Sequence, residues 1–186
     1  MNKTHLLPLL AALGALPAGA AQLDVSVQIP QLDVAEYHRP YVAVWIERED
    51  RSVAANLSVW YQVKRNAPNA MAPAAVGAKP ASAESGTKWL PDLRQWWRRG
   101  GRDLAMPADG LSSATKPVGT HEQSYGDKSP LAALAPGRYK LVVEAAREDG
   151  GRELVDVAFD WPAKAATAVE AQGKSELGAI RVAVKP

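Results

Sequence analysis

The chain has 186 residues, with 22 lysines and arginines against 20 aspartates and glutamates, so its formal net charge at pH 7 is +2. This near balance excludes a dedicated nucleic-acid-binding protein, because phosphate recognition needs a concentrated basic surface. Cysteine is absent, which excludes disulfides, zinc–thiolate and iron–sulfur centres, and cysteine nucleophiles.

The first residues have the pattern of a secretory signal peptide. Lys3 gives a positive start, the apolar run over residues 6–16 is too short to span a bilayer, and an Ala-x-Ala ending leads to Gln22. We therefore expect residues 1–21 to be removed on export and residues 22–186 to form one domain in the periplasm. Nothing else in the sequence is apolar enough for direct membrane insertion.

Three strands are predicted in the first part of the mature chain. Residues 23–29 alternate apolar and polar side chains and stop at a proline, as a half-buried strand does. Residues 41–47 are more continuously apolar, which is typical of a central strand. Residues 56–63 form the third, after a hairpin connection over residues 48–55. Three successive strands indicate an antiparallel sheet.

A change of composition follows these strands. Residues 66–86 consist mostly of Ala, Pro, Ser and Gly, which cannot bury enough surface to pack, and they predict a low-complexity surface insertion. Residues 89–99 then place apolar side chains at helical spacing with arginines opposite, and Gly100-Gly101 ends this predicted helix.

The last third of the chain predicts more strands. Residues 137–148 form one strand, and a turn at residues 149–151 leads into a second over residues 152–161. An alanine-rich connection precedes a final strand over residues 179–184. The whole pattern predicts an all-β protein, an immunoglobulin-like β-sandwich with one short helix and an elaborated loop. A small open barrel is the alternative.

The segment between the helix and the later strands carries the clearest functional signal. A turn-forming Asp-Gly pair is followed by small residues that lead to a threonine hydroxyl, and prolines on both sides favour an exposed loop. The segment resembles the acceptor sequence that extracytoplasmic flavin transferases modify, in which a threonine receives FMN through a phosphoester bond. The resemblance implies covalent FMN on Thr115, and Ser113 stands where glycine is commonest. The segment comprises Asp109, Gly110, Ser112, Ser113, Ala114 and Thr115.

Other interpretations of this segment are open. Asp, Gly and Ser are common in polar surface loops, so the segment is also consistent with a loop of no special function. Asp109 with Ser112 or Ser113 has the residue types of a hydrolase, but no Gly-x-Ser-x-Gly elbow accompanies them. We therefore predict no catalytic residues of this chain's own.

The predicted helix supplies candidate contacts for the flavin. Trp96 and Trp97 are suited to sandwich an isoalloxazine ring, while Arg98 is suited to neutralise the phosphodiester. The alternative is that the tryptophans are core residues and the arginines a solvated face. His38 and His121 are too few for a metal site without cysteine, so no metal is expected, although His121 lies close enough in sequence to approach the flavin. Trp89, Arg94 and Arg102 are further candidates of the same kind.

A wider resemblance covers most of the mature chain apart from the insertion and the C-terminal tail. Residues 37–45, 59–61, 88–98, the Thr115 segment and residues 143–148 together resemble the DUF2271 family of predicted periplasmic proteins. That resemblance implies an association with flavin transferases and with PepSY-type membrane redox proteins, and hence extracytoplasmic electron transfer.

These observations predict a periplasmic flavoprotein in which FMN on Thr115 serves as an electron carrier. Two other functions are consistent with the sequence. One is a non-enzymatic β-sandwich binding module without flavin, and the other is a flavin-dependent oxidoreductase with a substrate of its own.

Overall fold

The structure is a computed structural model that describes residues 21–63, 86–126 and 130–186. The predicted signal peptide, apart from Ala21, and the predicted insertion, apart from Gly86, lie outside the described residues.

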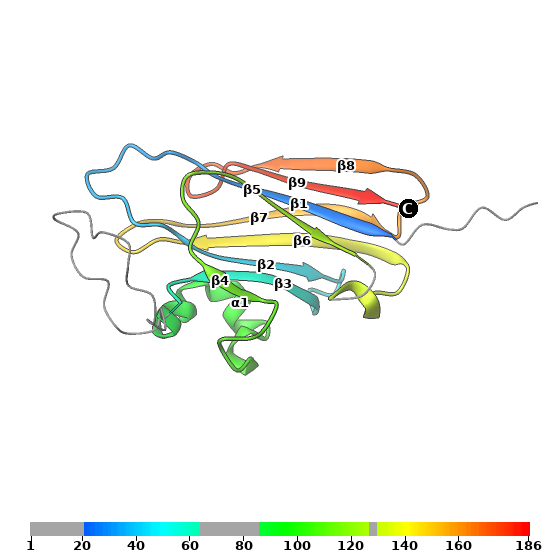
Figure 1. Ribbon diagram of the computed structural model, residues 1–186, viewed down its shortest axis with the longest axis horizontal. Helices are drawn as coiled ribbons and strands as arrows, with labels where there is room; N and C mark the ends of the chain where they lie inside the picture. The colour runs from blue at the N-terminus through cyan, green and yellow to red at the C-terminus, as the bar shows by residue number, and fades with distance from the viewer. Residues whose placement is uncertain (1–20, 64–85, 127–129) are drawn as a thin grey trace, which may run out of the picture.

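In the described part of the chain, nine strands form two sheets packed face to face (Figure 1). All neighbouring strands are antiparallel except β3 and β4, which run parallel. The predicted all-β sandwich is confirmed, and the barrel alternative is wrong because the sheets remain separate.

The four-stranded sheet has the order β5 (Gly119–Tyr125), β1 (Gln22–Ile29), β9 (Ala179–Lys185), β8 (Thr167–Gln172). The five-stranded sheet has the order β4 (Ser112–Ala114), β3 (Val53–Tyr61), β2 (Tyr41–Glu47), β6 (Gly137–Ala146), β7 (Arg152–Trp161).

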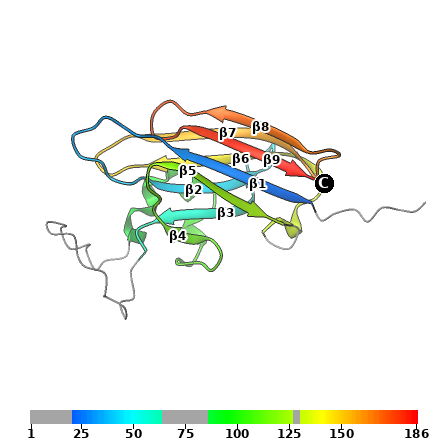
Figure 2. The same cartoon turned by 45° about the horizontal axis from the view of Figure 1, so that its top comes forward.

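The main core lies between the two sheets, whose layering is also visible when the molecule is turned (Figure 2). Strand β1 contributes every second residue to it, as its alternating sequence predicts, because successive side chains of a strand point to opposite faces. The pairing of β2 with β3 contains a register shift: Val44 pairs with Ser58, but the next residue, Trp45, pairs with Asn56. Beyond this β-bulge, Trp60 packs in the main core while Val59 and Tyr61 face the other way.

A second core covers the outer face of the five-stranded sheet. The segment from Gly86 to Asp103 lies on this face as η1 (Gly86–Asp92), α1 (Arg94–Arg98) and η2 (Gly101–Asp103). Its apolar side chains Leu90, Leu93 and Trp96 are buried against the sheet. The sheet residues in this cluster are Ala43, Trp45, Val59, Tyr61, Val142 and Ala146.

The helix predicted over residues 89–99 is present as an α-helix only over Arg94–Arg98. The chain forms a 3-10 helix first, leaves helical geometry at Leu93 with ψ of 68°, and then makes an α-helix of only five residues. Pro91 lies inside the first piece and has no backbone N–H to donate, so it interrupts a regular α-helical ladder. The predicted stop at Gly100 is confirmed, where φ is 138°.

Three strands were missed by the sequence interpretation. Residues 112–114 and 119–125, expected in an exposed loop, form β4 and β5, and the alanine-rich connection contains β8. The inward positions of β5 are polar or aromatic. The Gln123 side-chain amide donates to the Ser58 hydroxyl on β3, and the Tyr125 hydroxyl donates to the Leu57 carbonyl on the same strand. Hydrophobic alternation is therefore weak in β5, and β8 is an almost fully exposed edge strand.

Gly101 provides a test of the outer layer. A Cβ atom at this position would lie 2.6 Å from a ring carbon of Trp96, so we expect Gly101→Ala to lower the free energy of unfolding by about 1–3 kcal/mol. Gly126→Ala is the matched control, because no atom lies within 4 Å of the added methyl group. Urea unfolding measures both, and equal stability of the two variants would contradict the packing described for Trp96.

Candidate functional site

The predicted turn at Asp109-Gly110 is present and leads directly into β4. The amides of Leu111 and Ser112 both donate to the Ala108 carbonyl, at 3.2 and 3.0 Å, and Gly110 has a φ of 71°. A left-handed φ of this kind is easily adopted by glycine. The turn thus places the following residues alongside β3.

Strand β4 is held parallel to the end of β3. Ser112 pairs with Val59 and Ala114 pairs with Tyr61, and the Val59 amide donates to the Leu111 carbonyl at 2.8 Å. This strand is the edge of the five-stranded sheet, so one side of its backbone has no neighbouring strand in the described part of the molecule. Thr115 follows immediately after it.

The three hydroxyl groups in this segment have different surroundings. The Ser112 hydroxyl accepts from the Ala108 amide at 2.9 Å, and the Ser113 hydroxyl oxygen is buried without a partner among the described residues. Thr115 is half-buried and follows the exposed Ala114. Within the described residues its hydroxyl has no hydrogen-bond partner. Of the three, Thr115 therefore presents the hydroxyl that is both free and accessible.

Cationic and aromatic side chains surround the residues after Thr115. The Lys116 Nζ atom lies 5.9 Å from the Trp60 ring centroid, and the His121 ring meets the Trp60 ring edge-on at 5.6 Å. His121 Nε2 is 2.8 Å from the Pro117 carbonyl oxygen, which fixes the orientation of the imidazole. The sequence placed His121 near the threonine, and the structure brings it to the same rim of the sandwich.

Helix α1 lies over a different part of the sheet. Trp96 is fully buried, and its indole N–H donates to Asn56 Oδ1 at 2.9 Å. Arg99, one residue beyond α1, pairs with Glu47 at the end of β2 remote from Tyr41. These contacts hold the Trp96 ring and the C-terminal end of α1 over the middle and far part of the sheet.

Of the tryptophan and arginine residues predicted to contact the flavin, Trp96 is not available for stacking, while contact of Trp97 and Arg98 with a flavin on Thr115 stays a prediction. A fully buried indole has no free face for stacking, so Trp96 acts in this structure as a core residue. Trp97 is half-buried with its ring centroid 6.3 Å from that of Trp96, and Arg98 is exposed.

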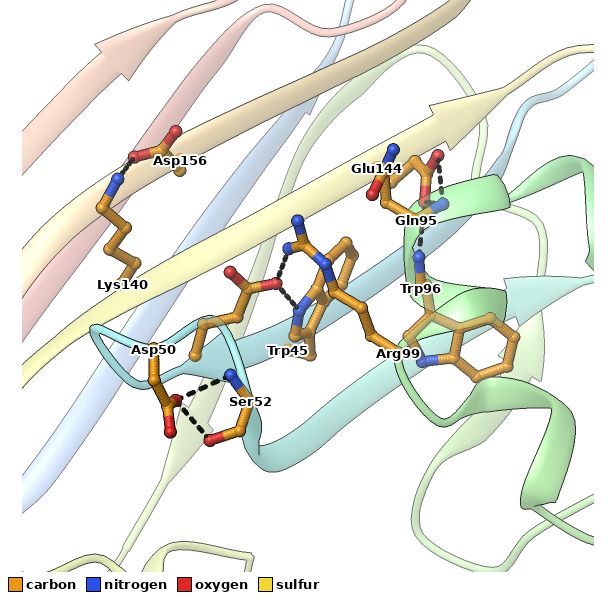
Figure 3. Close-up of polar contacts among 10 residues, drawn as sticks. Trp45, Asp50, Ser52, Gln95, Trp96, Arg99, Lys140, Glu144 and Asp156 are labelled. Carbon is orange, nitrogen blue, oxygen red and sulfur yellow. Dashed lines mark hydrogen bonds and ion pairs between the residues drawn. The ribbon is translucent and has the colours of Figure 1, made fainter.

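Two buried carboxylates attach the outer layer to the sheet (Figure 3). Glu144 has no exposed surface and accepts from the backbone amides of Gln95 at 3.0 Å and Trp96 at 2.9 Å, and from Arg152 at 2.9 Å. Glu47 accepts from the indole N–H of Trp45 at 2.7 Å and pairs with Arg99. A buried carboxylate needs such partners, because an unpaired charge inside a protein is very costly.

A pocket of about 540 Å³ lies beside Glu144, between η1 and the β6–β7 hairpin. Burial raises the pKa of the Tyr41 phenol in its wall. Arg147 in the same wall forms two hydrogen bonds to Glu176, at 2.9 and 3.1 Å, which raise its pKa. Trp89 and Arg94 are recognisable as candidates in the sequence, but the pocket is not, because the hairpin that completes it follows some fifty residues later. The lining residues are Arg39, Tyr41, Trp89, Asp92, Arg94 and residues 146–152.

A family model described as "Predicted periplasmic protein (DUF2271)" matches residues 22–179. The chain belongs to the DUF2271 family. No curated protein and no solved structure matches this DUF2271 protein. No helix among its described residues has the length and apolar character needed to cross a membrane.

Glu144 allows a test of how the outer layer is attached. Glu144→Gln keeps the size of the side chain but leaves a single acceptor oxygen for the two helix amides and Arg152. We expect the free energy of unfolding to fall by about 1–3 kcal/mol, because a buried donor loses its partner. Glu122→Gln, on the exposed side of β5, is the control. An unchanged urea midpoint for Glu144→Gln would show that this carboxylate does not anchor α1.

Proposed function

We propose that this DUF2271 protein is exported by a signal peptide at residues 1–21 and carries FMN on Thr115 through a phosphoester bond. It then serves as an electron carrier in an extracytoplasmic redox chain. The observation that supports this most directly is the state of the three hydroxyls around β4. Ser112 is hydrogen-bonded and the Ser113 oxygen is buried, whereas Thr115 is free at the end of an edge strand.

Attachment requires a flavin transferase with FAD as the donor. The Thr115 oxygen bonds to the FMN phosphorus, the P–O bond to the AMP half breaks, and AMP leaves while the threonine proton passes to a base of the transferase. The acceptor must therefore enter the active site of another protein. The edge position of β4 suits this, because its free side and the exposed Ala114 leave room for a second protein.

The residues around Thr115 fit an attached phosphodiester. Lys116 is the next residue and supplies a positive charge, which stabilises the single negative charge of a diester. The turn at Asp109-Gly110 and the Ser112 hydrogen bond to Ala108 hold the segment in one conformation. When bound, FMN supplies one- and two-electron transfer, and the protein supplies its position and electrostatic environment.

Covalent attachment suits a protein outside the cytoplasm, because a dissociated cofactor would be lost. On this proposal a PepSY-type membrane redox protein is its partner in electron transfer. On this proposal the redox chemistry belongs to the attached flavin, and this favours a carrier over an enzyme. Reoxidation of the reduced protein by a small molecule, without any partner protein, would instead identify an oxidoreductase.

Intact mass tests the attachment site. Protein coexpressed with a flavin transferase should gain the mass of FMN less one water, and Thr115→Ala should remove this gain completely because no nucleophilic oxygen remains. Ser113→Ala is the matched control and should keep the modification, since the Ser113 oxygen is buried. An unmodified wild-type mass, or a modification that survives Thr115→Ala, would refute the proposal.

A further inference from the structure

The pocket between η1 and the β6–β7 hairpin has an unusual aromatic side chain at its mouth. Trp89 is 47% exposed and is the one exposed aromatic residue in the described part of the chain. The Nζ atom of Lys88 lies 5.3 Å from the centroid of its ring. Tyr41 contributes a second, half-buried ring to the pocket wall. Exposed aromatic surface beside a concave site is typical of a place where a planar ligand stacks.

The charges of the pocket divide into those that hold the fold together and those that remain available. Arg147 is bound to Glu176 and Arg152 is bound to Glu144. Arg39 and Arg94 have no ion-pair partner among the described residues, and both line the pocket. Two cationic groups are therefore free to bind a ligand.

The pocket also offers hydrogen-bond acceptors. Asp92, Glu148 and Asp149 line it, all three are exposed, and none has an ion-pair partner among the described residues. A ligand suited to these walls is planar and combines carbonyl oxygens for arginine with an N–H for a carboxylate. The imide edge of an isoalloxazine ring has this arrangement, an N–H flanked by two carbonyl groups.

The pocket and Thr115 lie at the same end of the five-stranded sheet. Ala114 pairs with Tyr61, Trp60 pairs with Val42, and Tyr41 pairs with Ala146 in the pocket wall. Strand β4 is therefore two strand spacings from β2 at this end. Neighbouring strands are about 4.8 Å apart, so the separation is roughly 10 Å. An extended ribityl phosphate chain spans a comparable distance.

We propose that this pocket receives the isoalloxazine ring of the FMN attached to Thr115, with Trp89 stacked on the ring and Arg94 facing its imide edge. The inference rests on the proposed attachment at Thr115. A tether of this kind keeps the ring at a high local concentration, so even weak contacts fill the pocket. Arg94 then stabilises the negative charge of the reduced ring and raises its midpoint potential.

The test uses full-length protein coexpressed with a flavin transferase, and intact mass first establishes that FMN is attached. Stacking on tryptophan quenches flavin fluorescence by electron transfer from the indole, so Trp89→Ala should raise the fluorescence of the attached flavin several-fold, while Trp89→Tyr, which keeps an electron-donating ring, should restore much of the quenching. Arg94→Gln should lower the midpoint potential. The matched controls are Val169→Ala and Arg181→Gln on the four-stranded sheet, which should leave both readings at the wild-type value.

The two proposals fail in different ways. If the wild-type protein is modified but Trp89→Ala and Arg94→Gln keep the wild-type fluorescence and potential, the pocket does not hold the ring and this inference is overturned, while attachment stands. If the wild-type mass is unmodified, attachment fails and the inference fails with it. Circular dichroism and the urea midpoint of each variant show that it is folded, so a change in fluorescence reports the pocket itself.

Discussion

The attachment of the outer layer to the five-stranded sheet, through the buried carboxylate of Glu144, is the constraint on which the rest of the site depends. A helix of five residues is not stable alone, because the entropic cost of its first turn outweighs its few hydrogen bonds. Glu144 accepts its first amides and also binds Arg152 of the neighbouring strand. One side chain thereby fixes where α1 begins and holds the β6–β7 hairpin beside it.

That arrangement separates two kinds of aromatic residue. Trp96, whose own amide donates to Glu144, directs its side chain into the sheet, where Asn56 accepts from its indole N–H. The residues before the anchor, Trp89 and Arg94, stay at the mouth of the pocket. The interruption at Leu93 is what makes this separation possible, since a continuous helix would place Trp89 and Trp96 on one face, two turns apart. The break in the helix therefore creates a surface suited to a ligand next to a surface suited to packing.

The proposed attachment and the proposed ring site divide the work between an edge strand and a rigid pocket. Strand β4 is short and lies at the edge, which suits a segment that another protein must bind during modification. The pocket wall consists of the β6–β7 hairpin, which the Arg147 to Glu176 pair and the bond from the Gly151 amide to Glu176 hold against the other sheet. A carrier needs both properties, because its cofactor has to be added once and then kept in a constant electrostatic environment.

The fold class, strands β1, β2, β6, β7 and β9, and the turn at Asp109-Gly110 are predictable from the amino-acid sequence, because alternation and turn residues are local signals. The family is recognisable from sequence motifs in the same way. The pairing of β4 and β5, the broken helix, and the different roles of Trp89 and Trp96 are not predictable in this way. These depend on partners far away in the chain: β3 for β4, Ser58 and Leu57 for β5, Glu144 for α1 and Asn56 for Trp96. Two tryptophans seven residues apart look equivalent by composition and spacing, and the position of the sheet beneath them makes one a core residue and leaves the other exposed.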